Sequence, residues 1–177
     1  MQQKTQDFRF VLRELAMAPV QAHQRQPHAT VQPTTVTLLI RQLHSKHPEE
    51  AHRAIETLRA KGWLSSGALK GVDLQDIQLR GADLYMADLG KADLRGANLT
   101  GADLSMANLE GANFDTVNLT GADLSMANLE GAINLSNAQL AQTSRLWGAT
   151  MPDGTLYDGR FALVGDAEYA LISLERI

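Results

Sequence analysis

Three histidines and two serines are the residues of this chain whose types and spacing could do chemistry. His44 and His47 lie three residues apart and His52 follows, which loosely resembles the spacing of a zinc site. Such a site needs four His, Cys or acidic ligands in its structural form. The chain has no cysteine, and no cluster of acids completes the set. We therefore interpret these histidines as a solvated helix end and predict no metal site.

The candidate nucleophiles are Ser105 and Ser125. A serine hydroxyl needs an adjacent base, most often histidine, to attack a substrate. No histidine lies in the segment that holds the two serines, and the glycines recur at regular positions instead of forming a phosphate-binding loop. We predict that the protein is not an enzyme, has no catalytic residues and uses no cofactor.

A five-residue repeat, Ala-(Asp/Asn)-Leu-x-x, occupies residues 72–140 and organises the chain. A helix turns about 100° per residue and a strand alternates with period two, so neither keeps every fifth side chain on one face. All leucines and alanines can point inward only if the chain turns a corner once per unit. Corners of about 90° close a square coil after four units. The identity of Asn98–Ala112 with Asn118–Ala132 supports this period of twenty residues.

The run GADLYMADLGKADLRGANLTGADLSMANLEGANF resembles the pentapeptide-repeat family. The resemblance implies a mainly β fold, a right-handed quadrilateral β-helix. At roughly 4.8 Å per coil, about 3.5 coils would make a rod ~17 Å long. The resemblance implies no particular activity, because one fold serves many functions. We expect the Asp and Asn residues of the repeat to hydrogen-bond the adjacent backbone at each turn.

The repeat divides the chain into three predicted parts. These are an α-helical N-terminal head and cap over 1–66 with a linker at 20–33, the pentapeptide-repeat β-helix over 67–141, and a C-terminal cap and tail over 142–177. Apolar spacing predicts helices over 6–17, Val36–His44 and from Pro48 to about Ala60, with Gly62 ending the last one.

The two ends of the solenoid need covers, because terminal coils present bare leucines and unpaired backbone groups. We predict that Trp63 covers the first end and that Trp147 plugs the second. Leu135 comes one residue later than the repeat requires, so Ile133 is interpreted as an inserted residue that forms a bulge.

Three methionines, Met86, Met106 and Met126, should stack at one corner of successive coils, with Tyr85 beside the first. We predict a contact ridge there, since methionine makes adaptable apolar surface. Its cover is either the 6–17 helix, the segment 167–174, or a second copy in a homodimer. Glycine recurs at another corner, where a positive φ is easy. The methionine corner is expected to have a different turn.

Charge is unevenly distributed along the chain. Residues 1–70 carry ten Lys/Arg and five Asp/Glu, a balance of +5, whereas residues 71–140 carry three and ten, a balance of −7. The remaining residues carry three and five, a balance of −2, which completes the net charge of −4. The basic residues of the head are not interleaved with aromatics, so nucleic-acid binding is not expected.

The function that these features favour is a non-catalytic scaffold or adaptor that binds another protein through a solenoid face or the helical head. The alternative, taken from the resemblance, is an acidic DNA mimic that binds a DNA-handling enzyme such as gyrase. The predicted rod spans only about five base pairs at ~3.4 Å each, which disfavours it. No apolar run reaches the roughly 18 residues of a membrane span, and no secretory signal is evident, so the expected location is cytoplasmic.

Overall fold

A computed structural model describes residues 34–166 of the chain. They belong to one compact unit, Pro33–Ile177. Among the described residues the helices are α2 (Thr35–Leu43), α3 (Pro48–Ala60) and the short α4 (Asn137–Leu140), and residues 164–166 are also helical. α2 and α3 match the two helices that the sequence predicts, and Gly62 has the expected positive φ of 69°. The predicted segments 6–17 and 167–174 lie outside the described residues.

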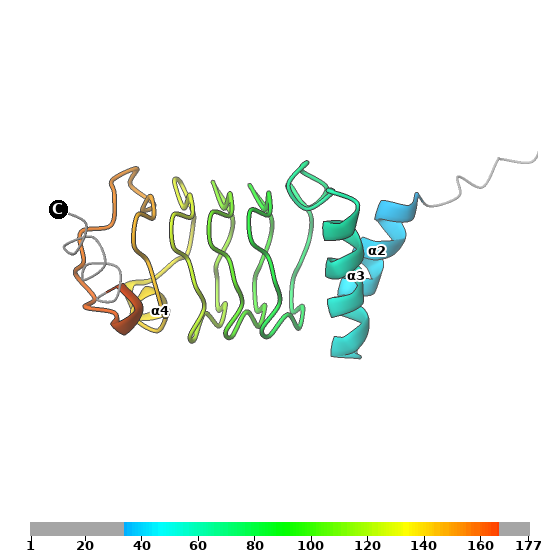
Figure 1. The fold of residues 1–177 in the computed structure, drawn as a ribbon, viewed down its shortest axis with the longest axis horizontal. Coiled ribbons are helices and arrows are strands. Elements are labelled where there is room, and N and C mark those ends of the chain that lie inside the picture. The colour runs from blue at the N-terminus through cyan, green and yellow to red at the C-terminus, as the bar shows by residue number, and fades with distance from the viewer. Residues whose placement is uncertain (1–33, 167–177) are drawn as a thin grey trace, which may run out of the picture. The chain divides into compact units, whose positions relative to one another are not determined.

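Between α3 and α4 the chain forms a stack of coils (Figure 1). Backbone pairing is parallel and joins residues twenty apart, as in Asp73 with Asp93, Gln78 with Asn98, Asp83 with Asp103, and Asp88 with Asn108. Four such pairings in each coil give it four sides. For example, Leu84 N donates to Asp103 O at 2.8 Å, and Asp103 N donates to Ala82 O at 3.0 Å. The prediction of a β-helical solenoid is confirmed.

The interior of the stack consists of the repeat's leucines and alanines. The leucine of every five-residue unit from Leu74 to Leu129 is buried, and Phe114 replaces leucine in one unit. The alanines that stand two residues before these positions, from Ala82 to Ala127, are buried as well. Burying each leucine is worth about 1.5–3 kcal/mol. The five-residue period thus produces the inward-facing columns that the sequence predicts.

The acid and amide column residues bond their own backbone, as expected. Asp103 Oδ1 accepts a hydrogen bond from the backbone N–H of Ser105 at 2.9 Å, and Asn118 Oδ1 accepts one from the N–H of Thr120 at 3.0 Å. The same bond to the residue two positions later recurs in unit after unit of the repeat. These side chains therefore stabilise the corners.

All corners share a left-handed residue, and the predicted difference between corners is wrong. Met86, Met106 and Met126 have φ values of 57°, 58° and 57°, close to the 65° of Gly101. The methionine and glycine corners close with the same hydrogen bond, such as Ala87 N to Leu84 O and Ala102 N to Leu99 O, each at 3.0 Å, as in a type II turn. Hydrogen bonds between neighbouring coils hold each methionine in this geometry, although a residue with a Cβ disfavours positive φ.

The ladder is interrupted after Ile133, and the predicted bulge at that residue is wrong. Ile133 pairs with Asn113 in the regular register of twenty. The chain then leaves the stack through α4 and returns with a register of 22, pairing Asp123 with Arg145 and Asn128 with Thr150. The two extra residues therefore lie between 134 and 144. The ladder continues to Thr150, beyond the predicted end of the β-helix at 141.

Gln139 replaces ladder bonds where α4 interrupts the stack. Its Nε2 donates to the carbonyls of Phe114 and Val117 at 2.8 and 3.0 Å. Its Oε1 accepts from the backbone N–H of Ser136 at 2.8 Å, which completes a capping box at the start of α4. One side chain thus satisfies both the interrupted ladder and the helix end.

We expect Gln139→Ala to lower the free energy of unfolding by about 1–3 kcal/mol, because two carbonyls lose their donor and the capping box is broken. Chemical denaturation measures the change. Gln142→Ala is the control, since the exposed side chain of Gln142 accepts a hydrogen bond from the Thr120 hydroxyl, which is also exposed, and its backbone bonds are kept in the variant. Equal effects of the two substitutions would contradict the role given to Gln139.

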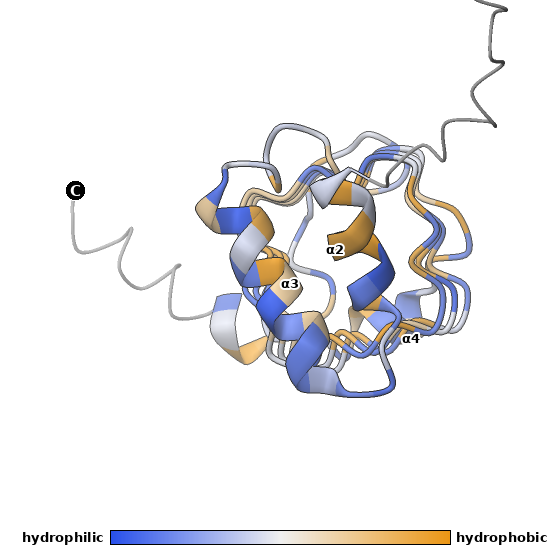
Figure 2. Cartoon of the chain, turned by 90° about the vertical axis from the view of Figure 1, so that its right-hand side faces the viewer, coloured by the Kyte–Doolittle hydropathy of each residue, from blue (hydrophilic) through white to orange (hydrophobic). Residues whose placement is uncertain are grey.

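α2 and α3 lie across the first coil and cap it (Figure 2). The carbonyl groups of the first coil lack the N–H donors that a preceding coil supplies elsewhere in the stack. His44 Nε2 bonds Asp73 O at 2.9 Å, His52 Nε2 bonds Arg80 O at 2.8 Å, and the Arg59 guanidinium donates to Asp83 O at 2.6 Å. His44 at the end of α2 and His47 at the start of α3 are both exposed, as a solvated helix end requires. The bonds of His44 and the half-buried His52 to the first coil were not predicted.

His52 also contacts its own helix. Its Nδ1 lies 2.8 Å from Pro48 O, so both ring nitrogens face carbonyl oxygens, which only accept. Among residues 34–166, no three His, Cys, Asp or Glu side chains gather as a metal site would require.

The two predicted end-cap tryptophans differ in their surroundings. Trp63 is partly buried and packs against the core, next to the buried Leu64. Trp147 is 43% exposed, and the buried Leu146 takes the core position instead. The prediction that Trp147 plugs the second end is therefore wrong. No helix among the described residues has the length and apolar character of a membrane span.

Candidate protein-binding surface

Five large apolar side chains lie exposed along one corner of the solenoid. Tyr85, Met86, Met106, Met126 and Trp147 are each between 40% and 51% exposed; we call these five residues the methionine ridge. Met126 N donates to Trp147 O at 2.8 Å, as Met106 N does to Ser125 O. Trp147 therefore occupies the place of Tyr85, Ser105 and Ser125 in the last coil, and aromatic residues stand at both ends of the ridge.

The ridge is continuous from coil to coil. The Tyr85 hydroxyl donates to the thioether sulfur of Met106 at 3.4 Å, across the boundary between two coils. At the other end Gly148 stands where a fourth methionine would be, and a Cβ there would lie 3.2 Å from Met126 Cγ. A side chain at position 148 would therefore crowd Met126.

Methionine is an unfavourable residue for these corners. A left-handed conformation costs a residue with a Cβ roughly 1–2 kcal/mol, and glycine does not bear this cost. Glycine fills the equivalent corner at Gly81, Gly101 and Gly121 of the preceding column. Three successive methionines thus place exposed apolar surface where glycine would form the turn more easily.

We expect Met106→Gly to leave the free energy of unfolding unchanged or to raise it by up to about 1 kcal/mol. Relief of the left-handed strain should offset the greater flexibility of glycine in the unfolded chain. Thermal and denaturant unfolding measure it, with Met106→Ala as the variant that keeps the strain. A loss above about 2 kcal/mol would mean that Met106 packs against a cover within the chain.

Acidic columns border the ridge on both sides. On one side Asp83 pairs with Arg59, and Asp123 pairs with Arg145 at 2.9 Å. Burial disfavours the ionised form of Asp123, but hydrogen bonds from Ser125 and Arg145 outweigh it and lower the pKa of this carboxyl group. Between them Asp103 bonds Ser105. The other side holds Asp88, Glu110 and Glu130. Lys91 stands at the next corner, in the column of Gly111 and Gly131.

A small hollow adjoins the first end of the ridge. Its volume is about 190 Å³, and it lies between the end of α3 and the first corner. Its lining residues are Arg59, Gly62, Leu64, Ser65, Tyr85 and Met86. Buried Leu64 and exposed Met86 make its walls partly apolar, so it can receive an apolar side chain.

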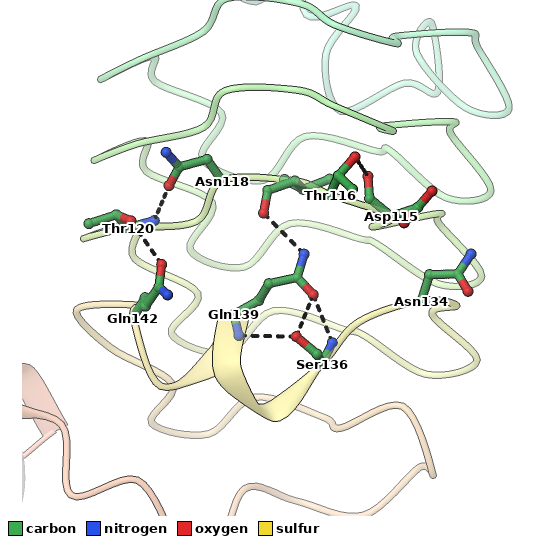
Figure 3. Close-up of a pocket in the computed structure, with 9 residues that line it drawn as sticks. Asp115, Thr116, Asn118, Thr120, Asn134, Ser136, Gln139 and Gln142 are labelled. Carbon is green, nitrogen blue, oxygen red and sulfur yellow. Dashed lines mark hydrogen bonds between the residues drawn. The ribbon is translucent and has the colours of Figure 1, made fainter.

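A second, polar cleft lies beside α4 (Figure 3). Its volume is about 530 Å³, and amides and hydroxyls line most of it, with Asp115 as its one carboxylate. Many of these groups are bonded to one another. Thr120 Oγ1 donates to Gln142 Oε1 at 3.0 Å, and Asn134 Nδ2 donates to Asn113 Oδ1 at 2.9 Å. The cleft therefore offers few free groups and little apolar surface to a ligand.

A family model for pentapeptide repeats, in eight copies, matches residues 64–96 and 97–133. A solved pentapeptide repeat protein from the cyanobacterium Nostoc is 30% identical over 63% of this chain and 92% of its own, with a TM-score of 0.24. The chain is a pentapeptide repeat protein. Members of this family fold as right-handed β-helices, so the resemblance seen in the sequence is confirmed.

Two other solved pentapeptide repeat proteins are similar over shorter shares. HetL of Nostoc, which is involved in the regulation of heterocyst differentiation, is 41% identical over 48% of this chain and 43% of its own, with a TM-score of 0.27. Rfr23 of Cyanothece is 35% identical over 49% of this chain and 60% of its own, with a TM-score of 0.28. The chain thus spans about half the length of these two relatives. No curated protein matches it.

The pentapeptide repeat brings the predicted site residues together. Met86, Met106 and Met126 occupy the same corner of successive coils, with Tyr85 next to the first. Ser105 and Ser125 lie beside it, bonded to Asp103 and Asp123 rather than to a base. Sequence analysis missed the place of Trp147, although Leu146-Trp147-Gly148-Ala149 follows the pattern of Leu119–Ala122. That pattern could have identified Trp147 as a corner residue.

Proposed function

We propose that this protein is a non-catalytic scaffold that binds another protein through the methionine ridge. The observation that carries the proposal is a continuous apolar column, exposed over several coils, at corners where methionine is disfavoured. Contiguous exposed apolar surface on a protein usually marks an interaction site. Methionine suits such a role because its unbranched thioether side chain adapts to the shape of a partner.

The test compares ridge variants in affinity capture from the native host. The full chain is used as wild type, as the triple variant Met86→Gly, Met106→Gly, Met126→Gly, and as the control Asp76→Gly, Thr116→Gly. Asp76 and Thr116 also have positive φ, 56° and 57°, but lie at the diagonally opposite corner. We expect at least one protein to be retained by the wild type and the control and lost by the triple variant. Recovery that does not depend on the ridge would overturn the proposal.

The alternative function, an acidic DNA mimic that inhibits gyrase, leads to a different expectation. Asp83 and Asp123 are paired with arginines, and the Asx side chains of the repeat bond their own backbone. The outward negative charge is therefore too sparse to imitate two phosphate strands, which carry one charge per ~1.7 Å. We expect no inhibition in a gyrase supercoiling assay. Potent inhibition that survives the triple glycine variant would favour the alternative.

A further inference from the structure

The shape and charge of the methionine ridge suit one class of partner. We propose that its occupant is a basic amphipathic helix of another protein, lying along the solenoid axis with its apolar stripe on the methionines. Lysine or arginine at the borders of that stripe would face the acids on either side of the ridge. This proposal rests on the proposed function and names the partner's chemistry.

The spacing of the ridge fits a helix better than a strand. Its side chains repeat once per coil, ~4.8 Å, whereas one face of a strand repeats every ~6.6 Å. A helix presents apolar side chains about once per turn, ~5.4 Å apart. The mismatch with a helix is ~0.6 Å per step, against ~1.8 Å for a strand. Three coil steps from Tyr85 to Trp147 span ~14 Å, the length of two to three helical turns.

The backbone of the ridge has no free edge for an added strand. The N–H groups of Met86, Met106 and Met126 bond the carbonyls of the next coil at 3.0, 2.8 and 2.8 Å. Strand addition needs unpaired N–H and C=O groups on a sheet edge. The ridge can therefore be recognised only through side chains, which is how a helix binds in a groove.

Charge favours a basic partner. Within residues 34–166, no ion pair joins Asp103, Glu110 or Glu130 to a cation. These three carboxylates border the ridge on both sides, and Lys91 is the cation on the Glu110 side. Complementary charge at the rim of an interface raises specificity and the rate of association. An apolar stripe between lysines and arginines matches this arrangement.

A second copy of the chain fits the ridge less well. Two ridges facing one another would bring acids against acids. A helix avoids that repulsion, and the hollow beside Leu64 and Met86 can take one apolar side chain from it.

The test uses the full chain with labelled methionine methyl groups and a synthetic peptide as the probe. The peptide has roughly 18 residues, about five helical turns, with leucines on one face and lysines on the other. Methyl NMR spectra should show shifts for Met86, Met106 and Met126. Met151 is the internal control because it is 3% exposed and lies in the core. Anisotropy of the labelled peptide measures its affinity.

We expect the triple glycine variant to weaken peptide binding at least about tenfold. The double variant Asp103→Asn, Glu110→Gln should weaken it about threefold to tenfold at low salt, and Asp115→Asn, at the opposite corner, should not. Equal binding of a leucine and glutamate peptide, unmoved methionine methyl groups, or no binding would each overturn the proposal. If host capture still depends on the ridge in those cases, the proposed function stands and only the class of partner is wrong.

Discussion

Leu104→Ala should lower the free energy of unfolding by about 2–5 kcal/mol. Leu104 is fully buried in the middle of the stack. Its N–H donates to Asp123 O at 2.8 Å, and ladder bonds hold the coils above and below. A backbone fixed on both sides cannot collapse around the space that the side chain leaves. The loss should therefore include the cost of a cavity as well as the lost transfer free energy.

Denaturant unfolding of the full chain measures this loss. Leu156→Ala is the matched control, because Leu156 is 69% exposed and should change the free energy by less than about 0.5 kcal/mol. Leu124→Ala, one coil further on, should resemble Leu104→Ala. A loss below about 1 kcal/mol at Leu104 would contradict a rigid stack.

The interior of the stack could be predicted because one signal determines it. A five-residue spacing of leucine is compatible only with a corner in every unit, and the alanine two positions earlier then faces inward as well. α2 and α3 could equally be predicted, since local sequence features mark where each helix begins. Thr34 caps α2 through the N–H of Thr37, and Pro48 stands at the first position of α3.

The corners at the methionines could not be predicted from local preference. A residue with a Cβ disfavours positive φ, and the sequence gives no warning that three methionines adopt it. The bonds that fix the corner come from the next coil, such as Met106 N to Ser125 O. Tertiary structure therefore overrides the preference of the residue.

The predicted bulge at Ile133 was wrong because Leu135 was treated as the next inward leucine of the repeat. In the structure neither residue takes the inward leucine position, because Asn134 is exposed with a φ of 57° and Leu135 is only partly buried. α4 then adds two residues before the ladder resumes. Counting from Leu146 instead places Ala149 and Met151 in the buried columns, where both lie.

The roles of His44, His52 and Arg59 depend on contacts distant in sequence. Each side chain bonds a carbonyl that lies 24 to 29 residues further along the chain. A single sequence does not reveal such pairs. The sequence does reveal that some side chains must bond the first coil, since the first coil of any solenoid has carbonyls without a partner.

Deletion of residues 1–66 should make the solenoid associate end to end. Three side chains of the helical cap, His44, His52 and Arg59, satisfy carbonyls of the first coil, and the buried Leu43 and Leu58 belong to the same core as its leucines. Removing them leaves unpaired backbone groups beside bare apolar surface, a template for another chain. Light scattering coupled to size-exclusion chromatography should show concentration-dependent oligomers of residues 67–177, larger than any formed by the full chain.

The complementary fragment, residues 1–66, should be largely unfolded by circular dichroism. Its two described helices bury Leu39, Leu43, Ala51, Ala54, Ile55 and Leu58, too little apolar surface for a chain of this size to fold alone. Arg59→Met in the full chain is a milder test, because it removes the donor to Asp83 O and Tyr85 O but keeps the apolar stem. It should lower stability by about 1–3 kcal/mol without association. A fragment 1–66 that melts cooperatively, or a solenoid that stays unchanged without it, would show that α2 and α3 form a domain of their own and not a cap.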